Sequence, residues 1–401
     1  MLTPQEHAEA ILRRLPPRAT VTLPLLDAAN YTLATNLTAP FDSPRFDNSQ
    51  MDGYALSSAQ QQRTPGVFTV GPTVAAGADP DELYPEGLGD SVAPIMTGAK
   101  LPRGTTTIVP VEECQPDTFT DDEVHIPSVP QQQYVRKAGS DSAAGSLLLQ
   151  AGTRLDALAI AALASQSITT VTVWQRPRVI ICTGGAEISH GDGNEGVASI
   201  PDANGPMLHQ LCRSVDIEVV DHIRTDDNVE RFVEDVARGV DKHQPDAVIT
   251  SGGISHGRYE VVRLAFAEHD AWFGHVAQQP GGPQGLATFR GTPVICLPGN
   301  PISTLVSFRL FVAPTLNRCD VGAYTARLTH AVTGLPDLRD QFLRGTYAVD
   351  AEGVLHATPI GGAGSHLLQQ AVGATCLIRI TARTHYHPGT AVQIYPLGEL
   401  L

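Results

Sequence analysis

The chain of 401 residues is acidic, with 27 Lys and Arg residues against 42 Asp and Glu residues and a formal net charge of −15. Binding to nucleic acid or to an anionic membrane surface needs clustered Lys and Arg, so the composition argues against both partners. The length corresponds to roughly two to four domains, and 42% hydrophobic against 17% charged residues gives each domain a core to bury. An anionic ligand would have to be held by local donors against an unfavourable overall field.

The first element that the sequence predicts is a helix that starts after Thr3. Thr3, Pro4 and Glu6 supply an N-cap, a proline at the first helical position and a capping box, and Pro16-Pro17 ends the helix. We find no apolar stretch of the signal-peptide kind and no run long enough to span a membrane. The cysteines lack zinc or redox spacing and are expected to be reduced, as in a cytoplasmic protein: Cys114, Cys182, Cys212, Cys296, Cys319 and Cys376.

The chain changes character over residues 38–150, where Pro and Gly recur every few residues between short alternating runs such as residues 66–70. This pattern predicts a small β-rich domain of short strands. An Ala- and Leu-rich stretch at residues 155–164 predicts a helix after it. The tail from about residue 325 predicts a second small β domain, because it contains three short β-type segments, at residues 343–349, 374–380 and 391–397.

Between these two parts, from Arg178 to Arg318, predicted strands and helices alternate. The strands are expected at residues 179–182, 217–223, 246–250 and 292–298, and the helices at residues 204–214 and 226–242. A further helix and a hairpin-like stretch precede the last strand. Such alternation predicts a parallel, doubly wound sheet with helices on both faces. The predicted fold class is therefore α/β plus β, with the β-rich part inserted before the α/β domain.

Three strands of the α/β region end in glycine-rich turns: Thr183-Gly184-Gly185, Ser251-Gly252-Gly253 and Pro298-Gly299-Asn300-Pro301. Ligands of doubly wound folds bind outside the carboxyl ends of the strands, where glycine lets the backbone approach closely and helix N–H groups favour an anion. Asn300 and Pro301 are expected to be the N-cap and first residue of a helix. A single turn of this kind can simply mark a strand–helix junction. Three in one sheet favour an anion or phosphate-ester site.

Acidic residues gather near the same strand ends, among them Glu187, Asp202 and Glu260. Carboxylates beside a phosphate site need a bridging cation, and Mg²⁺ is the usual hard cation there. Asp226 and Asp227 can be interpreted either as metal ligands or as caps of the helix that follows. His256 follows the second glycine turn, and an ordinary surface or core histidine is the alternative to a ligand role.

Longer motifs give the chain a family resemblance. Residues 46–55, Phe-Asp-Asn-Ser-Gln-Met-Asp-Gly-Tyr-Ala, resemble the FDNSxMDGYA signature of the molybdopterin molybdenumtransferases, the family that includes the C-terminal domain of gephyrin. Four further elements are similar to the family's IMTGAxxP, D-S-N-x-x-M/L, SGGVS and LPGNPVS motifs, at residues 95–102, 201–208, 251–255 and 297–303. The matches run in family order from about residue 20 to about residue 320.

The resemblance implies an elongated homodimer with four-part subunits. The parts would be residues 1–45 with 140–175 (N-terminal linker domain), 46–139 (β-rich domain), 176–322 (molybdopterin-binding α/β domain) and 323–401 (C-terminal β domain). It implies a cytoplasmic transferase that uses Mg²⁺ to insert molybdate into adenylylated molybdopterin, releasing AMP and forming molybdenum cofactor. The molybdopterin adenylyltransferase is a candidate partner. The site would lie between the α/β part of one subunit and the Asp47 and Asp52 segment of the other.

The matched motifs also imply site residues. The candidate catalytic residues are Asp47, Asp52, Glu187 and Glu260. The candidate ligand-binding residues are Asn48, Thr183, Gly184, Asp202, Asn204, Ser251, Gly252, Gly253, Ser255, Pro298, Gly299 and Asn300. The candidate Mg²⁺ ligands are Glu187, Asp226 and Asp227. Asp52 has a simpler alternative, as the Asp of a turn before Gly53. Ligand charge would also be met by local bases such as Arg136, Lys137 and Arg258.

The chain departs from the family motifs at four places. The STG[DNS]EL turn carries one extra residue in residues 182–188, and the Asp of a Gly-x-x-Asp element is replaced by Glu260. The PGKP element lacks its lysine at Gly282, and a GED-type turn has Ser140 in place of its acidic residue. These changes favour a second hypothesis, a catalytically weakened paralogue that binds molybdopterin or acts as a dimeric scaffold. A third, a generic phosphate-ester enzyme, fits poorly with the specific β-domain signature.

Overall fold

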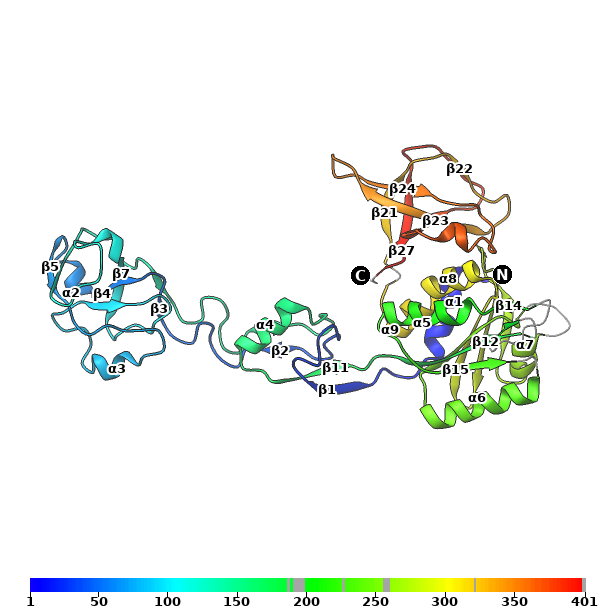
Figure 1. Cartoon of the computed structure of the whole chain (residues 1–401), viewed down its shortest axis with the longest axis horizontal. Coiled ribbons are helices and arrows are strands. Elements are labelled where there is room, and N and C mark those ends of the chain that lie inside the picture. Colours follow the sequence, from blue (N-terminus) through cyan, green and yellow to red (C-terminus); the bar gives the residue numbers. More distant parts are fainter. Residues whose placement is uncertain (186–187, 190–198, 226–227, 255–259, 321, 399–401) are drawn as a thin grey trace. The chain divides into compact units, whose positions relative to one another are not determined.

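The computed structural model describes residues 1–185, 188–189, 199–225, 228–254, 260–320 and 322–398. It divides into two compact units, one formed by Ala19–Gln175 and the other by Met1–Arg18 together with Arg176–Leu401. Figure 1 labels the elements of each unit along the chain. Within the described ranges, no helix has both the length and the apolar character needed to cross a membrane.

The unit formed by residues 19–175 consists of small antiparallel sheets, as the recurring Pro and Gly predict. Its two-stranded sheets pair β1 (Thr20–Pro24) with β11 (Thr170–Trp174), β2 (Leu37–Thr38) with β10 (Leu147–Leu149), β3 (Asn48–Ser49) with β9 (Val135–Arg136), and β5 (Gly66–Thr69) with β8 (Glu123–Ile126). In its three-stranded sheet, β4 (Gly53–Ser57) lies between β6 (Ala93–Ile95) and β7 (Thr105–Pro110). Its helices are α2 (Ser58–Gln61), α3 (Pro80–Leu83), the 3₁₀ turn η1 (Val111–Glu113) and α4 (Ala157–Ser165). The Asp156 side chain caps α4, which confirms the helix predicted at residues 155–164.

The second unit is built on a six-stranded sheet in which four neighbouring strands run parallel. In sheet order these are β15 (Glu218–Thr225), β12 (Arg178–Gly184), β16 (Ala247–Ser251) and β20 (Thr292–Leu297). They are followed by the antiparallel strands β19 (Pro283–Phe289) and β17 (Trp272–His275). The four predicted strands thus pair in parallel, as expected, and the hairpin-like stretch predicted before the last strand supplies β17 and β19. Arg290 and Gly291 both have positive φ, which produces the tight two-residue turn of a β-hairpin and returns β20 beside β19.

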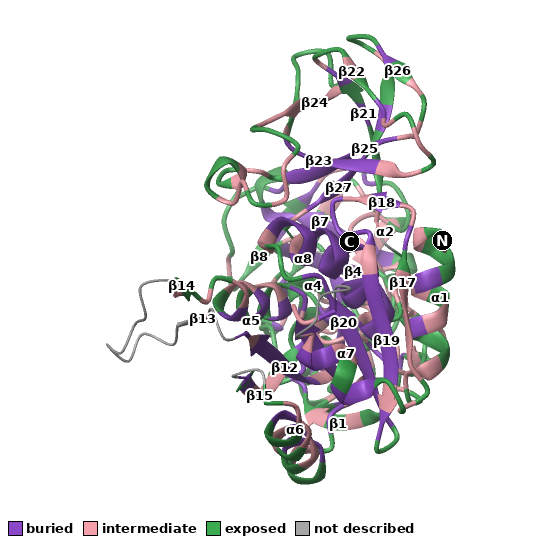
Figure 2. Ribbon diagram, turned by 90° about the vertical axis from the view of Figure 1, so that its right-hand side faces the viewer, coloured by how far each residue is buried: buried purple, intermediate pink, exposed green. Residues whose placement is uncertain are grey.

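Helices cover both faces of this sheet, as predicted. The helices are α1 (Pro4–Arg14), α5 (Asn204–Ser214), α6 (Val229–His243), α7 (Val261–Phe266), α8 (Pro301–Ser307) and α9 (Ala313–Asn317), with a π-helical turn η2 (Phe308–Val312) between the last two. Side chains alternate along β12, so Val179 and Ile181 pack with Leu208 of α5, whereas Ile180 packs with Val236 of α6. Figure 2 shows the resulting buried strands.

Two helix starts test the predicted caps. Thr3 and Glu6 form the predicted capping box of α1. Helix α6 was predicted from residue 226 but begins at Val229, because the Asn228 side chain accepts a hydrogen bond from the backbone N–H of Arg231 at 2.8 Å. Asn228 therefore occupies the N-cap position that the capping interpretation had given to Asp226 and Asp227.

The tail forms a β structure, as its three short segments predict, and this structure is closed. The strands β23 (Asp340–Val349), β24 (Leu355–Pro359), β21 (Tyr324–Leu328), β27 (Ala391–Pro396) and β25 (Cys376–Ile380) pair in a ring that closes between β25 and β23. Smaller elements of this unit are β13 (Ile188–Ser189), β14 (Ile200–Pro201), β18 (Gln278–Gln279), β22 (Val332–Thr333), β26 (His385–Tyr386) and η3 (Gln369–Ala371). Because β18 pairs with β23, the closed β structure is joined to the α/β sheet.

Candidate active site

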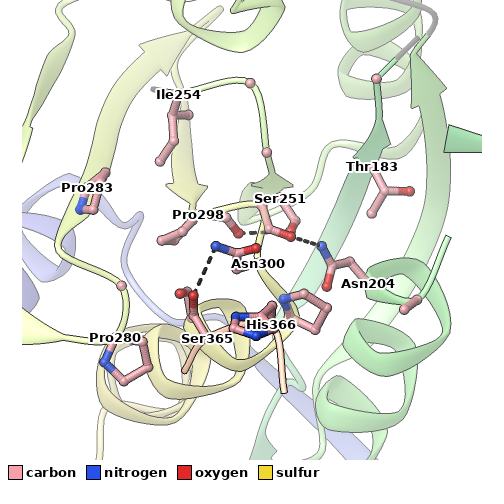
Figure 3. A pocket seen from close by; sticks show the side chains of 18 of the residues that line it. Thr183, Asn204, Ser251, Ile254, Pro280, Pro283, Pro298, Asn300, Ser365 and His366 are labelled. Carbon is pink, nitrogen blue, oxygen red and sulfur yellow. Dashed lines mark hydrogen bonds between the residues drawn. The ribbon is translucent and has the colours of Figure 1, made fainter. Parts of the chain in front are cut away.

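A cleft of about 980 Å³ lies at the carboxyl ends of β12, β16 and β20 (Figure 3). All three glycine-rich turns line it, as expected for a doubly wound sheet. The sequence-predicted residues that the structure brings together here are Thr183, Gly184, Asp202, Asn204, Ser251, Gly252, Gly253, Glu260, Pro298, Gly299 and Asn300. The cleft therefore gathers residues from five separate family motifs.

Glycine is required in these turns for steric reasons. Gly184 has φ +141°, and a Cβ built on it would lie 2.3 Å from the carbonyl oxygen of Thr225. Gly252 has φ +96°. A Cβ built on Gly299 would lie 3.3 Å from the Cα of Gly252. Two backbone segments thus approach each other more closely than side chains would allow.

Side-chain hydrogen bonds connect the second and third turns to each other and to α5. Ser251 Oγ donates to the carbonyl of Pro298 at 3.2 Å, and Thr304 Oγ1 donates to the same carbonyl at 2.7 Å. Asn204 Nδ2, from the first residue of α5, donates to the carbonyl of Gly299 at 2.7 Å. These contacts hold the cleft wall in one arrangement.

Asn300 has the predicted position, and its side chain makes a contact with a distant part of the chain. It is the N-cap residue of α8 and precedes Pro301, yet its side chain makes no capping hydrogen bond. Instead, Asn300 Nδ2 lies 3.0 Å from Ser365 Oγ, to which it donates (Figure 3). This contact arises because a loop of the C-terminal β structure, residues 363–366, packs beside the N-terminus of α8 and lines the cleft.

The described lining of the cleft carries charges of both signs. Asp202 and Glu260 contribute carboxylates. Among the described lining residues, Arg339 contributes a guanidinium group. Asp337 accepts hydrogen bonds from Arg339 Nη2 at 2.6 Å and Nε at 2.9 Å. Hydrogen bonding to Asp337 raises the pKa of Arg339, so this side chain keeps its positive charge and is held in place.

Sequence reasoning missed the contribution of the C-terminal β structure to this cleft. Arg339, Ser365 and His366 line it, as does the turn at Pro280–Pro283. The run Gly361-Gly362-Ala363-Gly364-Ser365-His366 was the available signal, because small residues beside a hydroxyl and an imidazole suit a ligand-facing loop. Nothing local in the sequence shows that this loop reaches a strand end of another domain.

The candidate residues of the FDNSQMDGYA segment belong to the unit of residues 19–175. Asp47 accepts hydrogen bonds from Lys137 Nζ at 2.7 Å and from the N–H of Ala138 at 2.8 Å. Burial opposes ionisation of Asp47, but these hydrogen bonds outweigh it and lower its pKa. Lys137, predicted as a base for the ligand, thus has Asp47 as its partner.

Asp52 and Asn48 make contacts that local sequence did not predict. Asp52 Oδ1 accepts hydrogen bonds from the N–H and the hydroxyl of Thr97, at 2.6 and 2.7 Å, and these contacts lower its pKa. Thr97 belongs to the IMTGA element, so two family motifs meet here. Asn48 is buried, with its Nδ2 donating to the carbonyl of Phe46. The ligand roles of these residues stay predictions.

Several predicted site residues lie outside the described residues: Glu187, Ser255, Asp226 and Asp227, together with His256 and Arg258. Among the residues that are described, His, Cys, Asp and Glu side chains form no group of three or more that could hold a metal ion. The predicted Mg²⁺ ligands are therefore not tested by the geometry.

The fold and cleft define a class of protein, a multi-domain α/β protein whose glycine-rich strand-end turns line a cleft. Family models match nearly the whole chain: "MoeA N-terminal region (domain I and II)" over residues 2–167, "Probable molybdopterin binding domain" over 180–318 and "MoeA C-terminal region (domain IV)" over 325–397. The chain belongs to the MoeA family.

Individual relatives are similar over their full length. "Molybdopterin molybdenumtransferase 2" of Mycobacterium tuberculosis is 33% identical over 423 residues, covering 99% of this chain and all of the relative. The molybdopterin molybdenumtransferase of Haemophilus influenzae is 29% identical over 413 residues, covering all of both chains. A solved molybdopterin biosynthesis MoeA protein from Pyrococcus horikoshii superposes with a TM-score of 0.80 at 25% identity, covering 99% of each chain.

Proposed function

We propose that the chain is a transferase that inserts molybdenum into molybdopterin during molybdenum cofactor biosynthesis. The observation that carries the proposal is the cleft at the carboxyl ends of β12, β16 and β20, which lies in the region matched by the molybdopterin-binding family model. The full-length relatives named molybdopterin molybdenumtransferase support the same reaction.

The finer proposal is that the substrates are adenylylated molybdopterin and molybdate, and that AMP is released. Both substrates are anionic. The N-termini of α5 and α8 lie at the cleft, where the positive ends of the helix dipoles favour negative charge. Arg339, which is ion-paired with Asp337, and the Ser365 hydroxyl supply hydrogen-bond donors for an oxyanion such as molybdate. Local donors of this kind would hold an anion in a chain of strongly negative net charge.

Mg²⁺ belongs to the proposal through the family resemblance. When bound, it would neutralise charge on the ligand phosphates. The carboxylates of Asp202 and Glu260 are oxygen donors of a suitable type, but no complete ligand set forms among the described side chains. Glu187, Asp226 and Asp227 remain the proposed ligands.

The reaction is tested by incubating the purified protein with adenylylated molybdopterin, molybdate and Mg²⁺ and measuring AMP. We expect AMP release that depends on molybdate and stops on chelation of Mg²⁺. A folded protein that binds molybdopterin without releasing AMP would instead support the weakened paralogue. Restoration of cofactor synthesis in a strain that lacks its own molybdenumtransferase would exclude that alternative.

We further propose a cytoplasmic homodimer in which Asp47 and Asp52 of one subunit face the cleft of the other, with the molybdopterin adenylyltransferase as the partner that delivers substrate. Mixing Asp52→Ala and Glu260→Gln variants tests the shared site, provided that the subunits exchange. Random exchange gives half mixed dimers, each with one intact site, so recovery of about one quarter of wild-type activity is expected. A site built within one subunit would recover nothing.

A further inference from the structure

Thr183 joins two side chains at the end of β12, next to the cleft. Its Oγ1 lies 2.7 Å from Asp202 Oδ2 and 2.7 Å from His222 Nε2. His222 comes from β15, the neighbouring strand, and its Nε2 is 4.0 Å from the same carboxylate oxygen. Thr183 and Asp202 line the cleft, whereas His222 supports them from behind. The side chains of Asp202 and His222 are only 11% and 12% exposed.

The direction of these hydrogen bonds follows from the number of protons. A carboxylate only accepts, so the single hydroxyl proton of Thr183 is donated to Asp202. Toward His222, the Thr183 hydroxyl can therefore act only as an acceptor. The imidazole of His222 must then carry a proton on Nε2 and donate it to Thr183 Oγ1. Burial, assisted by the nearby Arg224, lowers the pKa of His222 to about 4, so the imidazole is neutral at physiological pH. The chain of donation runs from His222 through Thr183 to Asp202.

The other side of the carboxylate is also fixed. Asp202 Oδ1 accepts a hydrogen bond from the N–H of Gly205 at 2.9 Å. A Cβ built on Gly205 would lie 2.6 Å from Asp202 Oδ2 and 2.7 Å from His222 Cε1. Only glycine fits at position 205, where the backbone packs directly against both partners. Two lone-pair directions of the carboxylate remain for a ligand.

We propose that His222 is a positioning residue, which acts through the Thr183 hydroxyl to orient the Asp202 carboxylate toward a ligand N–H donor in the cleft. The inference rests on the proposed function, because the 2-amino and ring N–H groups of a pterin are donors of this kind. His222 itself does not touch the ligand. Its loss lowers ligand affinity because the carboxylate then has more than one orientation to choose from.

Two histidine replacements form a matched pair. The amide nitrogen of Gln reaches the position of His222 Nε2, whereas that of Asn reaches only the position of Nδ1. We expect His222→Gln to stay within about twofold of wild type. Loss of one hydrogen bond corresponds to about 1 kcal/mol, so His222→Asn should raise KM for adenylylated molybdopterin about five- to tenfold with little change in kcat. Equal KM values for the two variants, at equal melting temperature, would overturn the proposal.

The threonine supplies a second pair. Thr183→Ser retains the hydroxyl, and Thr183→Val removes it at nearly constant volume, so only the valine variant should reproduce the KM of His222→Asn. A double variant, Thr183→Val with His222→Asn, should be no worse than Thr183→Val alone, because both changes interrupt one chain. Additive increases in KM would contradict a shared role.

A spectroscopic measurement separates this inference from the proposed function. In ¹⁵N-histidine spectra of the wild-type protein at pH 7, the signal that His222→Gln removes should show the neutral tautomer protonated at Nε2. Protonation at Nδ1 would overturn the inference even if AMP is released. The Nε2 tautomer in a protein that releases no AMP would sink the proposed reaction and leave the donation from His222 to Thr183 supported.

Discussion

Gly53, in the FDNSQMDGYA segment, has no room for a side chain. A Cβ built on it would lie 2.0 Å from the carbonyl oxygen of Val109 in the paired strand β7. We expect Gly53→Ala to lower the free energy of unfolding by about 3 kcal/mol or more, because backbone must move to admit the methyl group. Urea unfolding monitored in the unit of residues 19–175 measures this loss.

Gly77 is the matched control for that substitution. It has φ +87° but nothing within 4 Å of its Cβ position, so Gly77→Ala should cost only about 1 kcal/mol from backbone strain. Similar losses for the two variants would mean that the close approach to Val109 does not explain Gly53. A large loss of stability in Gly53→Ala alone would show that this glycine of the signature has a structural role, whereas Asp47 and Asp52 of the same segment are proposed to serve the site.

Gly282, at the position of the missing family lysine, can accept a side chain. Its Cβ position is 3.4 Å or more from the nearest atoms, and Gly282 lines the cleft. We expect Gly282→Lys to leave stability within about 0.5 kcal/mol, and to lower the molybdate concentration for half-maximal AMP release about fivefold, since a nearby charge contributes about 1 kcal/mol in water. Gly282→Met is the uncharged control. Equal effects of Lys and Met would show that charge is not what this turn lacks.

At the scale of elements, helix α1 carries a buried group that links stability to pH. His7 is fully buried, with its ring 4.8 Å from that of Phe311 and 5.3 Å from that of Trp272. Neither ring nitrogen has a hydrogen-bond partner among the described residues. Burial lowers the pKa of His7 from 6.5 to about 4. Between these values the unfolded chain binds more protons, so the free energy of unfolding falls as the pH falls.

Replacing this imidazole should remove part of that dependence. Between pH 7 and pH 5 we expect wild type to lose about 2 kcal/mol through His7, and His7→Phe to lack this loss while keeping the aromatic contacts. Guanidinium unfolding at the two pH values measures the difference. His222, whose pKa is also lowered to about 4, contributes a second loss that the variant retains. An unchanged pH dependence in His7→Phe would contradict the assignment.

Elements with strong local signals were predictable from the sequence. Helix α5 occupies the predicted residues 204–214, and α1 starts at its capping box. The hairpin-like stretch predicted before the last strand corresponds to the antiparallel strands β17 and β19. One contact depends on tertiary structure instead. Asn300 holds the predicted N-cap position of α8, but its side chain donates to Ser365, in a loop distant in the sequence.

The site was predictable to the same extent. The three glycine turns and Asp202 gather as expected, because carboxyl ends of parallel strands meet at one edge of the sheet. Arg339 and Ser365 were missed, since their approach depends on how the C-terminal β structure packs. Asp47 and Asp52 belong to another compact unit than the cleft, and a site shared with the cleft stays a prediction that rests on the proposed dimer.

At the scale of the whole molecule, net charge and ligand charge have the same sign. A protein of net charge −15 repels an anionic pterin phosphate at long range, whereas helix N-termini at the cleft attract it at short range. Salt screens the long-range part more strongly, because the Debye length falls from about 30 Å at 0.01 M to about 10 Å at 0.1 M. Added salt should therefore remove repulsion and leave most of the attraction.

We thus expect kcat/KM for adenylylated molybdopterin to rise about two- to fivefold between 0.01 and 0.1 M ionic strength at fixed Mg²⁺, opposite to the behaviour of proteins that bind anions through basic patches. Stopped-flow measurement of AMP release in potassium chloride and in potassium acetate separates screening from specific chloride binding, because only screening is common to both salts. A decrease in both salts would mean that the cleft's own positive potential extends beyond its walls and dominates the encounter. In that case the acidic residues of the chain lie too far from the substrate's path to affect it, and the net charge has no bearing on ligand capture.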